Sequence, residues 1–198
     1  MTEPAYESRE RIAQARAGRG FEAAAPGLWC AGDLAGLALP CVAIVGTRAA
    51  TPYGRRVAQS IAADLGRAGC CVLSGLALGV DAAAHEGALS AGAPTIGILG
   101  SGHRHFFPPK NRPLAERILA GGGAVLSPYT PDEEARPWQF LERNGIVAAL
   151  ADALHVVGRS CERRAVADQG EAAGGVPAVD VAWDGEDRDP PGRPTRGV

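Results

Sequence analysis

Five short hydrophobic runs recur through the middle of the chain, separated by longer polar or helix-like stretches. They are Val42–Val45, Cys70–Leu73, Thr95–Leu99, Ala124–Leu126 and Ala153–Val157, and they begin 25 to 29 residues apart. Runs without strict alternation are typical of strands that are buried on both faces of a parallel sheet. The pattern predicts an α/β fold with a doubly wound, mostly parallel sheet, which is a Rossmann-like fold.

The first gap between these runs, Thr51–Gly66, predicts an amphipathic helix. Its larger apolar residues recur at every fourth position and define one helical face: Val57, Ile61 and Leu65. Thr51 suits the N-cap and Pro52 suits the first helical position. Gly66 or Gly69 suits the end of the helix.

Composition and charge narrow the class of protein. The 198 residues are 46% hydrophobic, which suits one domain with a sizeable core, and the formal net charge is −2. Five acidic residues fall between positions 180 and 189, and residues 1–179 carry equal numbers of acidic and basic side chains. The global charge therefore gives no argument for nucleic-acid binding, and any anion site must be local.

Cysteine usage and the N-terminus predict a cytoplasmic protein. The five cysteines include no C-x-x-C pair, so we expect buried, reduced thiols. The first 20 residues lack the apolar core of a signal peptide, and the longest apolar stretch, Gly145–Gly158, is too short and too polar to span a bilayer. We expect no membrane association.

The loops after the predicted strands hold the candidate chemistry, because ligands of such sheets bind beyond the carboxyl ends of the strands. Each loop contains a hydroxyl group and most contain glycine: Gly46-Thr47-Arg48, Ser74–Gly79, Gly100–Arg104, Ser127–Tyr129 and Gly158–Ser160. Glycine lets backbone N–H groups approach an anion closely, and the helix start behind each loop adds positive potential. Glycine is also common in ordinary βα turns, but together with Arg48 and Lys110 these loops favour a phosphate ligand.

Known phosphate-binding fingerprints do not identify that ligand. The G-x-G-x-x-G dinucleotide motif is absent after the first run, and GSGHRH matches only half of it. The G-x-x-x-x-G-K-[ST] loop is missing, which argues against ATP hydrolysis by that route. The residues alone therefore indicate a phosphate-bearing ligand, either a nucleotide or a nucleic acid.

Several longer motifs resemble the DNA-processing protein A family, also called DprA or Smf. They are VAIVGTRAATPYG (42–54), VLSGLALGVDAAAHEGAL (72–89), GILGSGHRHFFPPKNRPLAERI (97–118), LSPY (126–129) and FLERNGIVAALADALHVV (140–157), with GLWCAGDL (27–34) as a lead-in. The resemblance implies a protein with an extended Rossmann-like fold, not known as an enzyme and without a cofactor. Such a protein binds single-stranded DNA, protects it and passes it to RecA during natural transformation.

The resemblance also implies a DNA-binding pocket, carried over position by position. Its residues are Gly46, Thr47, Arg48, Ser74, Gly75, Gly79, Asp81, Gly100, Ser101, Gly102, Lys110, Asn111, Arg143 and Asn144. Arg48 can form a forked contact with a phosphate, and Lys110 supplies a point charge. Three aromatic rings offer surfaces for unpaired bases, although burial is the favoured interpretation for the first two: Phe106, Phe107 and Tyr129.

Departures from the family divide the chain into three parts. We expect residues 1–26 to form a partly disordered extension, 27–181 the DprA-like Rossmann domain, and 182–198 a disordered acidic tail. Residues 158–181 diverge from the family, and Gly145 replaces the last arginine of its Arg-Asn-Arg motif. A truncated or frame-shifted gene would produce such an end. Because the divergent stretch borders the family's dimer contact, it places homodimerisation and RecA loading in doubt more than DNA binding.

Two other functions and two candidate metal sites are weighed against this interpretation. A nucleoside-monophosphate phosphoribohydrolase has a related fold but carries a Pro-Gly-Gly-x-Gly-Thr-x-x-Glu motif, and Gly121–Ala124 runs into a strand without that glutamate. A nucleotide-binding sensor would bind mononucleotides but not single-stranded DNA. Asp81 and His85 share one helix face, but a third metal ligand is not evident, so we expect them to brace a loop. His103 and His105 also lack a nearby ligand, and no metal is expected.

Overall fold

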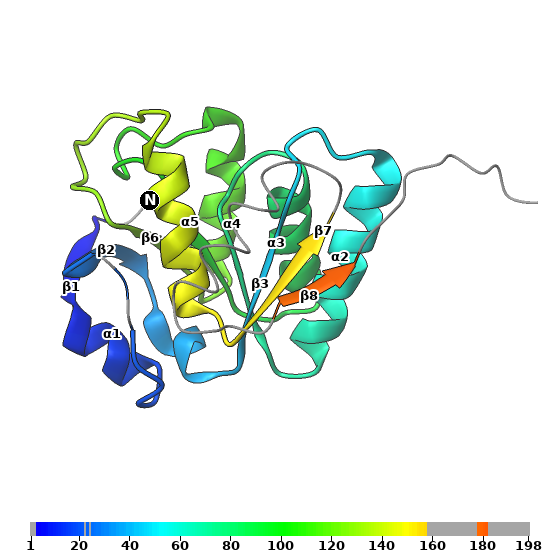
Figure 1. Ribbon diagram of the computed structural model, residues 1–198, viewed down its shortest axis with the longest axis horizontal. Coiled ribbons are helices and arrows are strands. Elements are labelled where there is room, and N and C mark those ends of the chain that lie inside the picture. The colour runs from blue at the N-terminus through cyan, green and yellow to red at the C-terminus, as the bar shows by residue number, and fades with distance from the viewer. Residues whose placement is uncertain (1–2, 22, 24, 158–177, 182–198) are drawn as a thin grey trace, which may run out of the picture.

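The computed structural model describes residues 3–21, 23, 25–157 and 178–181. Within these residues, an eight-stranded sheet runs through the molecule in the order β1-β2-β6-β5-β4-β3-β7-β8 (Figure 1). The strands are β1 (Ala5–Ser8), β2 (Gly27–Gly32), β3 (Cys41–Gly46), β4 (Cys71–Ser74), β5 (Thr95–Ile98), β6 (Ala124–Ser127), β7 (Ala153–Val157) and β8 (Ala178–Val181). All five predicted strands are present, each within one residue of its expected bounds.

Along the order β6-β5-β4-β3-β7-β8, each strand pairs in parallel with the next, which confirms the predicted α/β class. β3 is central, because Val42 pairs with Val72 of β4 on one side and with Ala153 of β7 on the other. β1 and β2 extend the sheet beyond β6 as antiparallel strands, with Trp29 opposite Ser127. The sequence pattern did not predict these two strands.

Helices cover both faces of the sheet (Figure 1). One face carries α2 (Pro52–Arg67), α3 (Val80–Ser90) and α4 (Arg112–Ala120). The other face carries α5 (Gln139–Leu150), α1 (Arg9–Ala15) and the 3-10 helix η1 (Leu34–Ala38). A second 3-10 helix, η2 (Pro109–Asn111), leads directly into α4.

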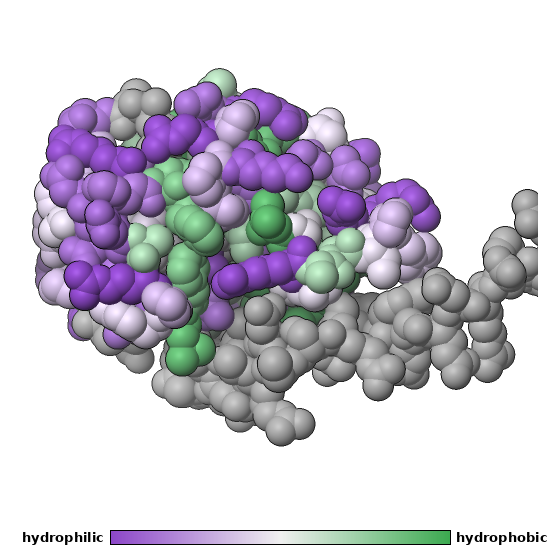
Figure 2. Space-filling model, turned by 90° about the horizontal axis from the view of Figure 1, so that it is seen from above, coloured by the Kyte–Doolittle hydropathy of each residue, from purple (hydrophilic) through white to green (hydrophobic). Residues whose placement is uncertain are grey.

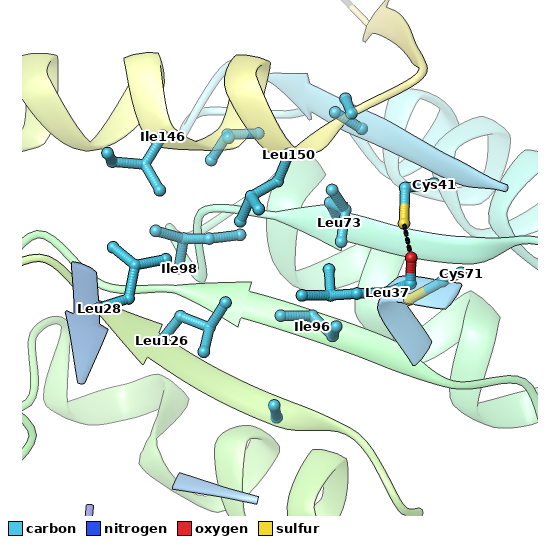
Figure 3. Packing of buried hydrophobic residues seen from close by; sticks show 14 of the residues in the cluster. Leu28, Leu37, Cys41, Cys71, Leu73, Ile96, Ile98, Leu126, Ile146 and Leu150 are labelled. Carbon is cyan, nitrogen blue, oxygen red and sulfur yellow. Dashed lines mark hydrogen bonds between the residues drawn. The ribbon is translucent and has the colours of Figure 1, made fainter. Parts of the chain in front are cut away.

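Each central strand sends alternate side chains into different cores. Ala43 and Val45 of β3 belong to the cluster on the α5 side, whereas Ile44 packs with α2 and α3. Figure 3 shows the α5 side, where Ile146 and Leu150 of the helix lie over the hydrophobic side chains of the sheet. Burial on both faces explains why the runs do not alternate with polar residues.

The α2 helix begins and ends where the sequence predicts. Thr51 is the N-cap, and its Oγ1 accepts a hydrogen bond of 3.1 Å from the backbone N–H of Gly54. Pro52 occupies the first helical position, and the helix ends at Arg67. Gly69 follows with φ +84°, a left-handed conformation that glycine adopts without strain.

The N-terminal segment is tied to the amino ends of the central strands through one carboxylate. Asp152 pairs with the buried Arg16 at 3.2 Å and with Arg19 at 2.6 Å. Its Oδ2 also accepts a 2.7 Å hydrogen bond from the backbone N–H of Cys41. The stretch expected to be an extension therefore contains β1 and α1, which the sequence pattern did not predict. Residues 158–177 and 182–198 lie outside the described residues, so the expectations for them stay predictions.

The described cysteines are free thiols. Cys30, Cys41 and Cys71 are buried, and Cys70 is half-buried just before β4. Cys161 lies outside the described residues. No helix in the described ranges is both long enough and apolar enough to cross a membrane.

Candidate nucleic-acid interface

The loops after β3 and β4 meet at the carboxyl edge of the sheet. The backbone N–H of Val80 donates a 3.2 Å hydrogen bond to the carbonyl of Thr47. Gly79 precedes α3 with φ +84°, and a Cβ at this position would collide with the carbonyl oxygens of Thr47 and Arg48. Glycine is therefore required at residue 79 both for its backbone conformation and for the close approach of the two loops.

A buried aspartate shapes the loop after β4. The Oδ2 of Asp81 accepts hydrogen bonds from the backbone N–H groups of Gly75 at 3.1 Å and Ala77 at 3.3 Å. Burial raises the pKa of this carboxyl group, and the positive charge of Arg143 opposes the rise. Asp81 thus braces the loop, as the sequence predicts, and its side chain is not available to a ligand.

Arg143 of α5 joins the ends of two strands from inside the protein. It is 4% exposed, and its Nη1 donates to the carbonyls of Gly75 and of Ile98, the latter at 2.8 Å. Its Nε donates to the Oδ1 of Asn144 at 3.2 Å. A Cβ on Gly75 would overlap the guanidinium group. The structure therefore places Arg143, a predicted DNA contact, as an internal brace beneath the loops.

Asn111 links the loop after β5 to the loop after β4. Its Nδ2 donates to the carbonyls of Leu76 at 2.9 Å and Ala77 at 3.0 Å, and the side chain is buried. Ser74 is also buried, with its Oγ donating to the carbonyl of Ile44 at 2.6 Å. Both side chains form part of the scaffold that fixes the loops.

The glycines of the loop after β5 are required by close packing. A Cβ on Gly100 would press against the ring of Phe140, and a Cβ on Gly102 would collide with the backbone of Thr130 and Pro131. The N–H of Gly102 is already used, donating to the carbonyl of Glu133 at 2.8 Å. Ser101 between them is fully buried.

Two predicted basic residues lie at the surface of this edge. Arg48 and Lys110 are exposed, and the Arg48 guanidinium lies 5.4 Å from the centre of the Phe140 ring. Phe140 in turn contacts Phe107, with ring centres 5.6 Å apart. Figure 2 shows this edge from above, where hydrophobic side chains are exposed among hydrophilic ones.

The aromatic residues divide between the interior and the surface. Phe106 is 4% exposed and Phe107 is 44% exposed, so burial holds for the first ring only. Tyr129 is half-buried, and its hydroxyl donates to Glu142 at 2.8 Å. Sequence reasoning missed Phe140 and the 51% exposed Trp138, which contacts Tyr129 edge-on. The one feature of the sequence that could have pointed to these two rings is their position just before the Arg143-Asn144 pair.

The histidines near the site have structural surroundings. His85 is fully buried, with its Nδ1 2.8 Å from the Oγ1 of Thr95. Burial, reinforced by the charge of Arg143, lowers the pKa of His85 to about 3, so the ring is neutral at pH 7. His103 is buried against the carbonyl of Val125 at 3.0 Å. Among the described residues, no three His, Cys, Asp or Glu side chains are grouped to hold a metal ion.

The predicted site residues thus form two layers. The inner layer is buried and fixes the backbone: Ser74, Gly75, Asp81, Gly100, Ser101, Gly102, Asn111 and Arg143. The outer layer is exposed or partly exposed: Gly46, Thr47, Arg48, Gly79, Lys110 and Asn144. The outer layer combines two cations, a hydroxyl group and backbone, which suits contacts with a phosphate-bearing chain.

Comparison with known proteins decides the family. The family model for DNA recombination-mediator protein A matches residues 11–163, which include every loop of this edge described above. The chain belongs to the DNA recombination-mediator protein A family. The match also takes in α1 from Arg11 onward and β2, so these elements fall within the stretch shared with the family.

Individual members of the DNA recombination-mediator protein A family align with this chain over only part of their own length. The DNA processing protein DprA of Bacillus subtilis is 34% identical over 116 residues, which is 59% of this chain and 39% of that protein. Protein Smf of Synechocystis is 40% identical over 119 residues, covering 60% of this chain and 30% of that protein. The chain therefore spans well under half the length of these curated relatives.

Solved structures of the same family share the fold. The DNA processing protein A of Streptococcus pneumoniae superimposes with a TM-score of 0.75 at 30% identity, over 83% of this chain and 58% of that one. The protein from Helicobacter pylori, whose structure addresses its single-stranded DNA binding mode, gives 0.70 at 31% identity, over 78% and 71%. These likenesses confirm the Rossmann-like α/β architecture.

Proposed function

We propose that this protein binds single-stranded DNA at the carboxyl edge of its sheet, without a catalytic role. The observation that carries the proposal is the outer layer of the site, where Arg48 and Lys110 are exposed beside fixed, glycine-rich loops. The body of the chain has no excess of positive charge, so this local arrangement is what can attract a polyanion. Family membership and the DNA-binding relative from Helicobacter pylori support the same function.

The geometry favours a single strand over a duplex. Phosphates can follow the loop edge past Arg48, and unpaired bases can lie against Phe107, which is 44% exposed. A stiff duplex keeps its bases stacked inside and cannot use such a ring. Contacts of this kind do not read base edges, so binding should depend little on sequence.

Fluorescence anisotropy with matched single-stranded, blunt double-stranded and mononucleotide ligands tests the proposal. We expect clear preference for the single strand. Equal affinity for a blunt duplex of the same length would overturn it. Binding of mononucleotides alone would identify a nucleotide sensor instead, and release of adenine from AMP would identify a phosphoribohydrolase.

We extend the proposal to the wider role of the family: protection of incoming single-stranded DNA and its transfer to RecA in transformation or recombination. We also propose a weak homodimer formed through the stretch that includes β8, whose backbone pairs in parallel with β7. Nuclease protection and RecA filament formation on the bound strand test the first part. Light scattering across a concentration series tests the second, and a strict monomer at high concentration would exclude it.

A further inference from the structure

Two neighbouring arginines project from the start of α2, outside the predicted site. Arg55 and Arg56, here called the α2 arginine pair, are both exposed and lie in the first two turns of the helix. Neither forms an ion pair with a carboxylate in the described part of the chain. An exposed arginine without a carboxylate partner can donate to an anion from outside, such as a phosphate.

Most other exposed arginines differ from this pair because a carboxylate is within reach. Ion pairs join Arg11 to Glu7, Arg19 to Asp152, Arg67 to Asp64, Arg104 to Asp132 and Glu3, and Arg136 to Glu133. Such pairing neutralises the local field at each of these positions. The α2 arginine pair has no such carboxylate among the described residues, and it differs from Arg117 and Lys110, which also lack one there, in placing two positive charges at adjacent positions.

The α2 arginine pair continues the surface that starts at Arg48. Arg48 ends the loop after β3, Thr51 caps α2, and the backbone N–H of Arg55 donates to the carbonyl of Thr51 at 3.0 Å. At about 1.5 Å of rise per residue, the pair lies about one turn from the carboxyl edge. Figure 1 places the start of α2 at one end of that edge, and Figure 2 shows several hydrophilic side chains at this end. The first carboxylate of α2 is Asp64, which is further along the helix and pairs with Arg67 at 2.7 Å.

We infer that the α2 arginine pair is a second phosphate-contact surface, which holds the single strand after it leaves the pocket at Arg48. The inference rests on the proposed function and assigns a direction to the bound strand, from the loop edge across the start of α2. The contacts are to phosphates, so they add affinity and salt dependence without base preference. A strand long enough to reach α2 uses them, and a short strand seated in the pocket does not.

A double variant, Arg55→Ala with Arg56→Ala, tests the inference against oligothymidylates of about 3 and about 20 nucleotides, which lie below and above the common site sizes of about 4–16 nucleotides. With the longer strand, we expect affinity to fall roughly 2- to 30-fold, as for two exposed ionic contacts. The log–log salt slope should flatten by about 1.4, since each phosphate contact on a single strand contributes about 0.7. With the shorter strand, affinity should change by less than twofold, because the two removed charges then act on the strand only from a distance and are screened by salt.

Arg117→Ala is the matched control for charge. Arg117 is exposed in the last turn of α4, at the opposite end of the helical layer, and forms no ion pair in the described part of the chain. Arg117→Ala should leave the log–log salt slope for the longer strand unchanged. The double variant Arg55→Lys with Arg56→Lys keeps both positive charges, so it should keep that slope as well. Equal losses with both strand lengths, or an equal effect of Arg117→Ala, would overturn the inference while leaving the proposed function intact. Absence of any single-strand binding by the unaltered protein would overturn both.

Discussion

Arg48 and Arg143 carry the same charge in motifs of the same site, yet the fold uses them differently. Arg48 is exposed on a loop beside the Phe140 ring, whereas Arg143 is 4% exposed and donates to two carbonyls at the strand ends. The difference follows from their elements, because Arg48 lies beyond β3 and Arg143 lies on the sheet-facing side of α5. A basic residue in a binding motif can therefore serve the shape of the site as well as the ligand.

The largest expected effect separates the two arginines by stability. Arg143→Ala leaves the carbonyls of Gly75 and Ile98 without their donor and removes the cation that offsets the buried charge of Asp81. We expect a loss of about 3–5 kcal/mol in the free energy of unfolding, as for a broken buried charge interaction. Urea unfolding measures it, with Arg136→Ala as an exposed control expected to change little. Unchanged stability combined with lost DNA binding would place Arg143 in the outer layer after all.

The reverse pattern is expected for Arg48→Ala. A charged hydrogen bond contributes about 1.5–3 kcal/mol, so single-strand affinity should fall roughly 10- to 150-fold at fixed salt. The log–log salt slope should flatten by about 0.7. Stability should fall by only about 0.5–1 kcal/mol, from the lost contact with Phe140. Anisotropy and urea unfolding of the same preparation measure both quantities.

Lys110→Ala should weaken single-strand binding in the same direction as Arg48→Ala but less, because an ammonium group is a point charge without a fork. If Arg48→Ala leaves a folded protein with unchanged affinity and slope, Arg48 is a structural residue and the proposed site is misplaced.

The smallest expected effect is a pH dependence confined to the inner layer. Burial lowers the pKa of His85 from 6.5 to about 3, so below pH 6.5 the unfolded chain binds a proton that the folded protein excludes. The contribution of the neutral ring is complete above pH 6.5 and is lost by about 1.4 kcal/mol per pH unit as the pH falls. Between pH 6.5 and 5, the stability advantage over His85→Gln should shrink by about 2 kcal/mol.

His85→Gln removes the titrating ring and leaves His103, whose pKa burial also lowers, as a shared background. Urea unfolding at several pH values checks the difference between the two proteins. A constant difference would mean that His85 is accessible to protons in the folded state.

Local pattern predicted the repeating part of the fold because the relevant signals lie within one element. The runs at Val42–Val45 and Ala153–Val157, and the Thr51 cap of α2, needed no distant partner to be recognised. β1 and α1 differ, since β1 exists by pairing with β2, and Arg16 is buried against Asp152, more than a hundred residues away. Such long-range partners leave no periodic trace in the sequence.

For the candidate site, the sequence identified the loops but could not predict which of their side chains are buried and which are exposed. Arg143 reaches carbonyls 68 and 45 residues away, and Asn111 reaches Leu76 from 35 residues away. A motif match does not distinguish Arg143 and Asn111 from Arg48, because a motif contains residues that support the loops as well as residues that could contact a ligand. Burial alone separates them, and burial is a property of the folded chain.

The cross-link from Asn111 to the carbonyls of Leu76 and Ala77 also has a thermodynamic consequence for recognition. With Asp81 holding the same loop from below, the protein side of the interface is preorganised before any ligand arrives. Little conformational entropy remains for the protein to lose, so the ordering cost of association falls on the nucleic acid. In the proposed complex, differences in affinity between one strand and another should then follow how readily each strand straightens and unstacks.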